Sequence, residues 1–419
     1  MRLAGVLLRG RRYSTALFIA TAVGLSSAAL IAHAQADASK AETVRPEVGR
    51  PLQAAQELMR AQKYKEALAR IKEADAVGGK TPYESFIVER MRGAAAIGAG
   101  ETDTAVRALE ASINSGRLPA AEQLKLMEAL AGAAYRAKDY AKAQNWAQRY
   151  VHDGGSSSAV RTLLAQTQYL SGDYAGAAKG LSAEIAATEA AGAAPTEDKL
   201  QLLANCYLKL NDKAGYAAVL EKLVAYHPKK EYWADLLARV QRKPGFSPRL
   251  TLDVYRLMLA TGNLKDTSDF MEMAQLALQA GLPAEAKKVV DDGYAKGALG
   301  TGEEADRHKR LRDLANKQAA DDQKGLAEAE KQANAAKDGN ALVALGYAYA
   351  SNRQFDKGSA LLEQGIAKGN LKRPEDAKLH LALAYLQAGN RDKARHLLHS
   401  VQGTDGTADI ARLWLLQTK

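Results

Sequence analysis

The sequence predicts an all-α protein built from repeated pairs of helices. One pattern recurs from about residue 48 to about residue 401: a helix with small residues on one face, a break at Gly, Asp or Asn, an aromatic or apolar residue, and a second helix centred on alanine. Long alternating runs of Val, Ile and Thr, which are typical of strands, do not occur. An aromatic content of 6% also favours helix over sheet.

Four stretches show the pattern most clearly. In each, the small and apolar residues fall three or four positions apart, so each helix can bury one stripe against its neighbour. The four are LAGAAYRAKDYAKAQNWAQRY (Leu130 to Tyr150), LAQTQYLSGDYAGAAKGLSAE (Leu164 to Glu184), LANCYLKLNDKAGYAAVLEKL (Leu203 to Leu223) and LALAYLQAGNRDKARHLLHSV (Leu381 to Val401).

The N-terminus has the features of a secretory signal. Arginines up to Arg12 precede an apolar run from Ala16 to Ala32, and small residues stand at Ala32 and Ala34, the two positions that a signal peptidase reads. We therefore predict a signal peptide at 1–34, cleavage after Ala34 and a periplasmic location in a Gram-negative bacterium. The alternative is an uncleaved anchor in the inner membrane, for which the apolar run is short.

The charge of the mature chain is modest. The formal net charge is +10, and loss of the four leader arginines lowers it to about +6. No dense Lys/Arg block interleaved with aromatic residues occurs, so we do not expect nucleic acid as a partner. The single cysteine, Cys206, lies inside a repeat helix, cannot form an intrachain disulfide, and is interpreted as a small buried residue.

The repeated stretches resemble the tetratricopeptide repeat, a 34-residue helical hairpin with small or apolar residues at set positions. The resemblance implies an α-solenoid of about nine antiparallel helix pairs, two of them degenerate. Tyr216 and Gly358 depart from the alanine expected at position 20 and should alter helix spacing locally. The residues at position 20 are Ala67, Ala105, Ala143, Ala177, Tyr216, Ala286, Gly358 and Ala394.

Two stretches match the repeat poorly. The first, Tyr232 to Gly262, reads as helix, Pro-Gly break, helix. The second, Glu303 to Asp338, is charged and has few large apolar residues, which predicts an exposed helical hairpin or a long helix forming a thin joint. At the end of the chain, Thr407 to Lys419 repeats Leu and Trp at helical spacing and is expected to cap the last pair.

These patterns predict five consecutive segments. They are a signal peptide at 1–34, a flexible segment at 35–50, a first repeat array at 51–297, a charged helical joint or degenerate repeat at 298–338, and a C-terminal repeat pair with its capping helix at 339–419.

In proteins of this family, the first helix of each pair lines a concave groove. Amide and hydroxyl side chains there can hydrogen-bond an extended peptide; alternatively, they only solvate the inner face. The resemblance places these residues in the groove: Arg90, Thr162, Gln166, Tyr169, Gln201, Asn205, Lys209, Gln275, Gln279 and Tyr347. A subset of the family binds the C-terminal carboxylate of a peptide with Lys and Asn side chains. Here only Asn205 matches that pattern, and Gln201 occupies the position of the lysine.

A basic stretch from Tyr226 to Arg249 offers a second candidate surface. Its Lys and Arg residues could meet an acidic partner, with Tyr232 and Trp233 as anchors. The alternative interpretation is a pair of core aromatic residues beside a solvated helix end.

No catalytic residue, cofactor or metal site is predicted. His396 and His399 lie one helical turn apart, with His380 on the preceding helix, but no further ligand accompanies them. The glycines from Gly297 to Gly302 follow a helix rather than a strand, so they indicate a helix stop and not a phosphate loop.

The resulting functional prediction is a non-enzymatic scaffold that binds another protein of the cell envelope. The chain resembles exported tetratricopeptide proteins of proteobacteria, some of which accompany TonB, ExbB and ExbD energy-transducing systems. An alternative is a scaffold in envelope assembly or in the export of outer-membrane proteins or polysaccharide. A third, from another class, is an enzyme whose groups lie within Glu303 to Asp338, with His308 as its one histidine. No small-molecule substrate is evident, and the oligomeric state stays open.

Overall fold

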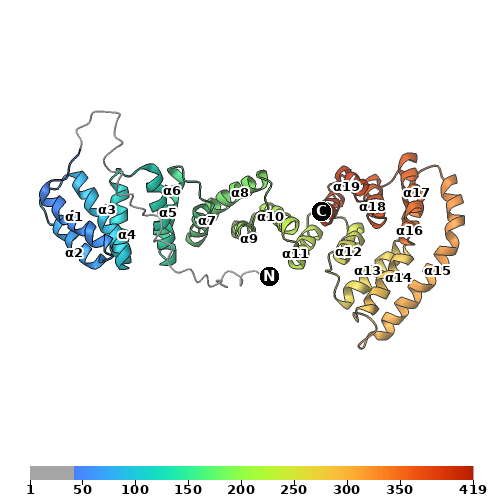
Figure 1. The fold of residues 1–419 in the computed structure, drawn as a ribbon. Helices are drawn as coiled ribbons and strands as arrows, with labels where there is room; N and C mark the ends of the chain where they lie inside the picture. The colour runs from blue at the N-terminus through green and yellow to red at the C-terminus, as the bar shows by residue number, and fades with distance from the viewer. Residues whose placement is uncertain (1–41, 419) are drawn as a thin grey trace. The chain divides into compact units, whose positions relative to one another are not determined.

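A computed structural model describes residues 42–418 of the chain (Figure 1). Within these residues the secondary structure consists of twenty α-helices and one short 3-10 helix, with no strand. The all-α prediction is therefore confirmed. No helix in this range is both long and apolar enough to cross a bilayer. The predicted signal peptide, 1–34, lies outside the described residues.

The chain divides into two compact units between Asp173 and Tyr174. In the first unit, consecutive helices pack in pairs, with α7 against α5 and α6. The small residues predicted at position 20 lie in its core, with Ala67 and Ala143 fully buried. The helices are α1 (Pro46–Arg60), α2 (Tyr64–Asp75), α3 (Pro82–Ala99), α4 (Thr102–Asn114), α5 (Ala120–Arg136), α6 (Tyr140–His152) and α7 (Ser158–Ser171).

The second unit holds the remaining helices. The pairs α9 and α10, α13 and α14, α16 and α17, and α18 and α19 pack as the repeat predicts. The helices are α8 (Tyr174–Ala190), α9 (Glu197–Lys209), α10 (Lys213–Tyr226), α11 (Lys230–Gln241), η1 (Pro248–Leu250), α12 (Thr251–Ala260), α13 (Thr267–Gln279), α14 (Pro283–Ala295), α15 (Ala305–Ala335), α16 (Asn340–Ser351), α17 (Phe355–Lys368), α18 (Pro374–Gln387), α19 (Arg391–Ser400) and α20 (Thr407–Gln417).

The first helix begins earlier than the sequence indicated. Residues 46–50, expected to belong to a flexible segment, form the first turn of α1, and Val48 is fully buried. The reason is an anchor on α3: the Arg45 backbone N–H and Nε both donate to Glu84 Oε1, at 2.8 and 2.9 Å. These bonds from Arg45, with one from Thr81, hold the pKa of Glu84 at about 2.

Residues 298–338 confirm the long-helix alternative but do not form the thin joint that was expected. They contain one continuous helix, α15, of 31 residues, so the hairpin alternative is wrong. Leu311, Ala315 and Leu326 lie on its buried face at spacings close to multiples of the helical repeat. Through this face α15 packs against α13, α14 and α16. The segment therefore joins its neighbours into one body rather than forming a thin joint.

One continuous core spans the regions that the sequence placed in separate arrays. Phe270 of α13 and Val289 of α14 belong to the same cluster of buried residues as Leu362 of α17 and Leu383 of α18. The predicted boundary between 51–297 and 339–419 is therefore not a structural boundary. The boundary that the structure has lies between α7 and α8, which the repeat register assigns to a single pair.

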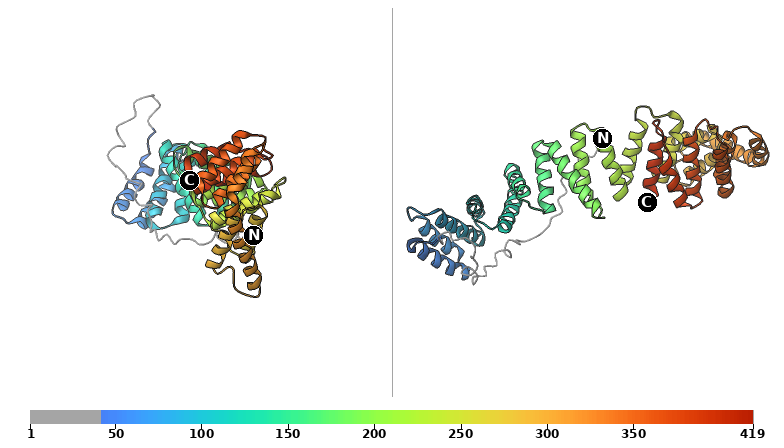
Figure 2. Two further views of the ribbon diagram at one scale, coloured as in Figure 1. Left: turned by 90° about the vertical axis from the view of Figure 1, so that its right-hand side faces the viewer. Right: turned by 90° about the horizontal axis from the view of Figure 1, so that it is seen from above.

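The C-terminal helix does more than cover the last pair. Ile410 and Leu413 of α20 are fully buried, and α20 packs against α18 and α19 as a cap would. It also packs against α10 and α12. The views of Figures 1 and 2 agree that α18 to α20 lie beside α12, so the second unit closes on itself.

The closest helix packing in the second unit occurs between α16 and α17, where glycines face each other. A Cβ atom at Gly358 would lie 2.7 Å from the Gly346 carbonyl oxygen and 2.7 Å from the Ala350 backbone nitrogen. These are backbone atoms that cannot move independently of their helix. Glycine at position 20 therefore has the predicted local effect, because it lets the two helix axes approach.

We predict that Gly358→Ala lowers the free energy of unfolding by about 1–3 kcal/mol, because the added methyl group overlaps α16. Urea denaturation followed by circular dichroism would measure the change. The matched control is Gly325→Ala in the middle of α15, where nothing lies within 4 Å of the new Cβ. That substitution should stabilise by about 0.5–1 kcal/mol through helix propensity. Equal effects of the two substitutions would contradict the close-packing argument.

Candidate functional site

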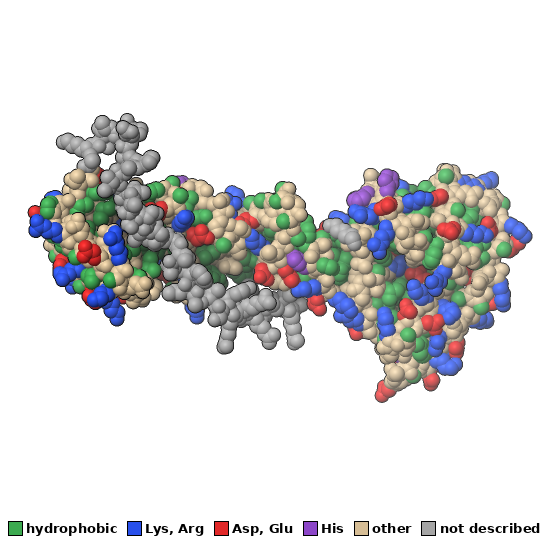
Figure 3. All heavy atoms as spheres, in the orientation of Figure 1, with side chains coloured by type: hydrophobic (Ala, Val, Ile, Leu, Met, Phe, Trp, Pro, Cys, Tyr) green, Lys and Arg blue, Asp and Glu red, His purple; other side chains and the backbone are tan. Residues whose placement is uncertain are grey.

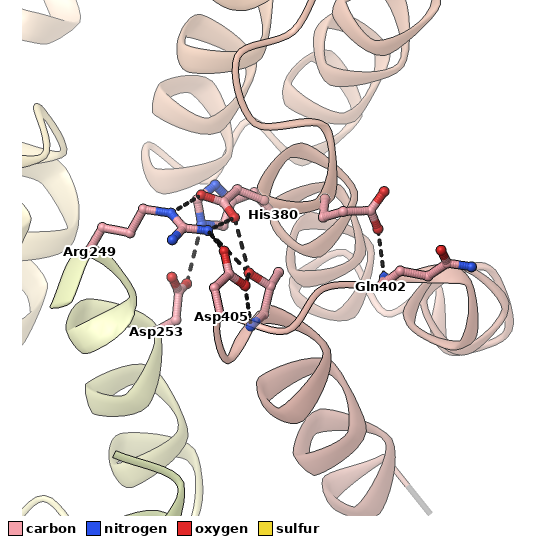
Figure 4. Close-up of polar contacts among 8 residues, drawn as sticks. Arg249, Asp253, His380, Gln402 and Asp405 are labelled. Carbon is pink, nitrogen blue, oxygen red and sulfur yellow. Dashed lines mark hydrogen bonds and ion pairs between the residues drawn. The ribbon is translucent and has the colours of Figure 1, made fainter. Parts of the chain in front are cut away.

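Two arrangements in the second unit bring polar side chains together: a partly buried ion-pair network and a surface cavity. The first lies where η1 and α12 meet α18 and the segment before α20 (Figure 4). Arg249 binds Asp376 through two parallel bonds, with Nε to Oδ2 at 2.9 Å and Nη2 to Oδ1 at 2.8 Å. Its Nη2 also donates to Asp405 at 2.7 Å. One guanidinium thus ties together segments more than a hundred residues apart in sequence.

Deeper in this interface, Arg256 of α12 lies 7% exposed between two carboxylates. Its Nη1 donates to Asp253 at 2.6 Å, and its Nε and Nη2 donate to Glu285 of α14 at 2.8 and 2.6 Å. His380 Nε2 lies 3.2 Å from the same Asp253 carboxylate. A buried guanidinium is tolerated only when its donors are satisfied in this way.

Tyr347, predicted to line the groove, lies inside this network. It is 5% exposed, its ring stacks on His380 at 4.4 Å between centroids, and the Arg256 guanidinium lies 4.9 Å from the ring centroid. The prediction that Tyr347 is available to a ligand is therefore wrong. The closure of the second unit, which the sequence does not reveal, covers it.

Two carboxylates of the network remain ionised well into acid. Burial raises the pKa of Asp253, but Arg256 and His380 outweigh this and hold it at about 2. Partial burial likewise raises the pKa of Asp405, while hydrogen bonds from Thr407 and Arg249 hold it at about 2. All these groups are satisfied within the fold, so the network closes the unit and leaves nothing to bind a ligand.

The second arrangement is a cavity of about 890 Å³ on the second unit. One wall is α13, and the other is the segment that leads from α14 into the first turn of α15. Met271, Leu276 and Ala298 supply its apolar lining. The cavity is lined by Lys265, Asp266, Thr267, Ser268, Met271, Glu272, Gln275, Leu276, Gln279, Ala298, Glu304 and Arg307.

Local bonds hold the walls of the cavity in place. Asp266 and Asp269 form a capping box at the start of α13. The Thr267 hydroxyl donates to the Ala298 carbonyl at 2.8 Å, which joins α13 to the opposite wall. In that wall, Gly300 adopts φ +85°, and its N–H donates to His308 Nδ1 at 3.1 Å. The cavity is therefore preformed rather than a gap between mobile loops.

Gln275 and Gln279, both predicted groove residues, are exposed in this cavity. They lie one turn apart on α13, and within residues 42–418 neither side chain makes a hydrogen bond. The Lys265 ammonium is likewise exposed and forms no ion pair in that range. Glu304 and Arg307 pair with each other at 3.2 Å. The arrangement offers hydrogen-bonding groups beside apolar surface and holds no nucleophile and base in contact.

The other predicted groove residues of the first unit are less open. Arg90 is exposed but pairs with Glu122 of α5 at 2.9 Å, linking two successive repeats. Thr162, Gln166 and Tyr169 lie half-buried along α7. The structure therefore keeps these three on one helix face but does not bring Arg90 beside them.

In the second unit, several predicted residues serve the fold. The Gln201 amide donates to the Tyr232 hydroxyl at 2.5 Å, Asn205 is half-buried, and Lys209 is exposed. Trp233 and Tyr232 are each only 4% exposed, so Trp233 is a core residue and cannot anchor a partner. The alternative interpretation of the basic stretch is the correct one.

Internal ion pairs occupy most cations of the basic stretch. Lys229 pairs with Glu197 at 2.5 Å, Lys243 with Asp409 at 2.8 Å, and Arg249 with Asp376. Arg239 pairs with Asp235 one turn before it. Except for Asp235, these acids lie on other helices far along the chain, which is why the stretch looks unbalanced in isolation.

Neither the cysteine nor the histidines form a reactive or metal-binding site among the described residues. Cys206 is buried, and burial raises the pKa of its thiol to about 11. His308 is 2% exposed, so the residue named for the enzyme alternative does not reach solvent. His380 lies against Asp253 rather than in a histidine cluster. In the part of the chain that the structure describes, no group of metal-ligating side chains assembles.

Sequence reasoning found two glutamines of the cavity and missed the rest of its lining. Lys265 precedes α13 in a loop, while Glu304 and Arg307 lie in the segment interpreted as a joint. Only the packing of α15 against α13 and α14 makes these residues neighbours. No local pattern signals such a contact.

Comparison with known proteins yields structures rather than sequence relatives. No family model matches the chain, and no curated protein is significantly similar to it. Similar solved structures include the TPR2AB domain of yeast Sti1 in complex with pHSP90, at 13% identity, a TM-score of 0.24, and coverage of 71% of this chain and 100% of that one. The TPR domain of P58(IPK) has 13% identity, a TM-score of 0.21, and coverage of 88% and 98%.

The structure of Naa15/Naa10 bound to HypK-THB is also similar, at 16% identity and a TM-score of 0.29. This chain spans 58% of that one, with 85% of this chain covered. Such low TM-scores carry no weight of their own. The buried small residues and the successive helix pairs identify the protein as a tetratricopeptide-like α-solenoid, as its sequence predicted.

We predict that Asp253→Asn lowers the free energy of unfolding by about 3 kcal/mol, because it removes one carboxylate from a buried guanidinium. Denaturation followed by tryptophan fluorescence would report it, since Trp233 and Trp414 both lie in the second unit. As the control, Asp313→Asn breaks an exposed pair with Lys309 and should cost less than about 1 kcal/mol. A loss no larger than that of the control would show that the network does not stabilise the closure.

We also predict an acid-labile closure. The pKa values of Asp253 and Asp405 are lowered from 3.8 to about 2 in the folded state. Their stabilisation is therefore complete above the unfolded value and is lost as the pH falls through about 2. The melting temperature should drop over this window, and Asp405→Asn should flatten the drop. Parallel pH profiles for wild type and variant would contradict this assignment.

Proposed function

We propose that the protein is an exported, non-enzymatic scaffold of the bacterial periplasm that binds an extended segment of another envelope protein in the α13 cavity. The observation that carries this proposal is the pair of exposed glutamines, Gln275 and Gln279, beside the apolar lining. A fold assembled from stacked helix pairs supports it, because such arrays present surfaces to partners.

The spacing of the two glutamines suits an extended peptide. Residues four apart on a helix are separated by about 6 Å along its axis. Alternate residues of an extended chain repeat at about 6.6 Å, so two successive backbone groups on one edge of the peptide would meet the two amides. Each amide has donors and an acceptor, which lets it bond either a carbonyl or an N–H.

The apolar lining supplies the second part of recognition. Met271 and Leu276 lie on α13 next to the glutamines, and Ala298 lies on the facing wall. A peptide side chain that points away from the glutamines would bury apolar surface here. Methionine adapts to side chains of different shape, so the cavity is suited to more than one sequence.

The export assignment rests on the N-terminal sequence. The apolar run from Ala16 to Ala32 and the small residues at Ala32 and Ala34 support cleavage and release into the periplasm. Association with a TonB, ExbB and ExbD energy-transducing system is the pathway we propose. It is supported by the resemblance of residues 232–262, which fold into α11, η1 and α12.

Site-specific crosslinking in intact cells tests the partner. A photoreactive amino acid at Gln279, in the cavity, should capture a discrete envelope protein, whereas one at Lys309, exposed on α15, should not. Recovery of ExbB-like, ExbD-like or TonB-like proteins supports the energy system. If components of an assembly or export machine are captured instead, the energy-system pathway is rejected, but the proposal of a scaffold stands.

The double substitution Gln275→Ala/Gln279→Ala should weaken capture of the partner on the order of tenfold, because two hydrogen bonds are lost. Quantitative pull-down with the purified partner would measure it. The control is Gln323→Ala, which removes an exposed glutamine from α15. If wild type and double variant bind alike, the cavity is not the binding site.

A further inference from the structure

Helix α19 presents a basic face that the fold does not use. Its buried stripe consists of Ala394 and Leu398, and all its charged side chains are exposed. Three are cations and one is an acid, Asp392, and two histidines accompany them. Figure 3 shows histidine side chains gathered where Figure 1 places this helix. The exposed side chains are Arg391, Asp392, Lys393, Arg395, His396 and His399.

None of these side chains forms an ion pair with another described residue. This distinguishes them from the cations that hold the same part of the fold together. Lys243 pairs with Asp409, and Arg249 pairs with Asp376. The cations of α19 are therefore not held in ion pairs inside the unit and remain available to the carboxylates of a partner.

A hollow of about 440 Å³ lies beside this face. Leu381 and Tyr385 of α18, with Leu397 of α19, form its apolar lining. Its polar lining consists of Asp392, Lys393 and His396. The Lys393 ammonium lies 5.3 Å from the centre of the Tyr385 ring. One ammonium and one carboxylate thus border a space large enough for a peptide side chain, and the other two cations of α19 lie outside the lining of the hollow.

We propose that the α19 face, together with this hollow, is a docking surface for an acidic segment of a protein partner. Carboxylates of the segment pair with Arg391, Lys393 and Arg395, while one of its apolar side chains enters the hollow. We choose an acidic partner because of charge complementarity: α19 exposes three cations without an ion pair and only one carboxylate.

A membrane surface is the less suitable occupant. Peripheral binding to a bilayer needs large apolar side chains that project from the surface. The large apolar residues most exposed in residues 42–418 are Leu170, Leu208, Leu210 and Leu314, and none of them lies on α18, α19 or α20. The apolar part of the α19 surface is instead recessed. It involves different helices from the α13 cavity, so it is a separate interface whose test is independent.

The test uses the full mature chain and a fluorescein-labelled peptide of alternating Asp, Glu and Gly with one central Trp and an amidated C-terminus. Fluorescence anisotropy should show saturable binding. Raising the salt from about 0.1 M to about 1 M shortens the Debye length from about 10 to about 3 Å and should abolish that binding. A peptide with Asn and Gln in place of the acids should not bind, and one with Gly in place of Trp should bind more weakly.

Arg391→Gln/Arg395→Gln should weaken binding of the acidic peptide on the order of tenfold. The control Lys309→Gln/Lys331→Gln removes the same charge from α15, where both lysines are exposed, and should leave binding unchanged. Equal losses in both variants, or equal binding of the neutral peptide, would overturn the proposal. So would binding to phosphatidylglycerol vesicles without binding to the peptide, which would assign the face to a membrane.

Discussion

The second unit depends on a guanidinium that is buried away from water. Arg256 can stay charged at 7% exposure only because Asp253 and Glu285 accept its hydrogen bonds. Asp253 lies on α12 and Glu285 on α14, while His380 of α18 approaches the same carboxylate. The helices must therefore keep a single relative placement, because any other would leave a charge unpaired in the interior.

This constraint explains why the unit closes. An open array of helix pairs would leave α12 facing solvent on the side that α18 and α20 now cover. Arg249 reinforces the closure by binding both Asp376 and Asp405. The closure also buries Tyr347 in the core and places His380 against Asp253. The free hydrogen-bonding groups remain elsewhere, on α13 and α19.

Residue patterns alone anticipated the repeat with considerable detail. Small residues at position 20 are buried in both units, and Gly358 brings its helices unusually close, as its departure from alanine suggested. Two of the residues predicted to line the groove, Gln275 and Gln279, line the α13 cavity. Helix periodicity encodes these properties, because it depends only on residues a few positions apart. The prediction that Tyr347 and Trp233 face a ligand was wrong, because their burial depends on helices that are distant in the sequence.

By itself, the sequence determined that this protein is a tetratricopeptide-like α-solenoid. It also determined which face each helix buries and where most helix pairs begin and end. The proposed location also rests on the sequence alone, on the apolar run from Ala16 to Ala32 and the small residues at Ala32 and Ala34. The tertiary structure alone decided that the chain divides between α7 and α8, that α15 joins its neighbours, and that the C-terminal helices return to α12. The return of the C-terminal helices depends on contacts such as Arg249 with Asp376, whose partners are separated by a long stretch of chain and leave no local pattern.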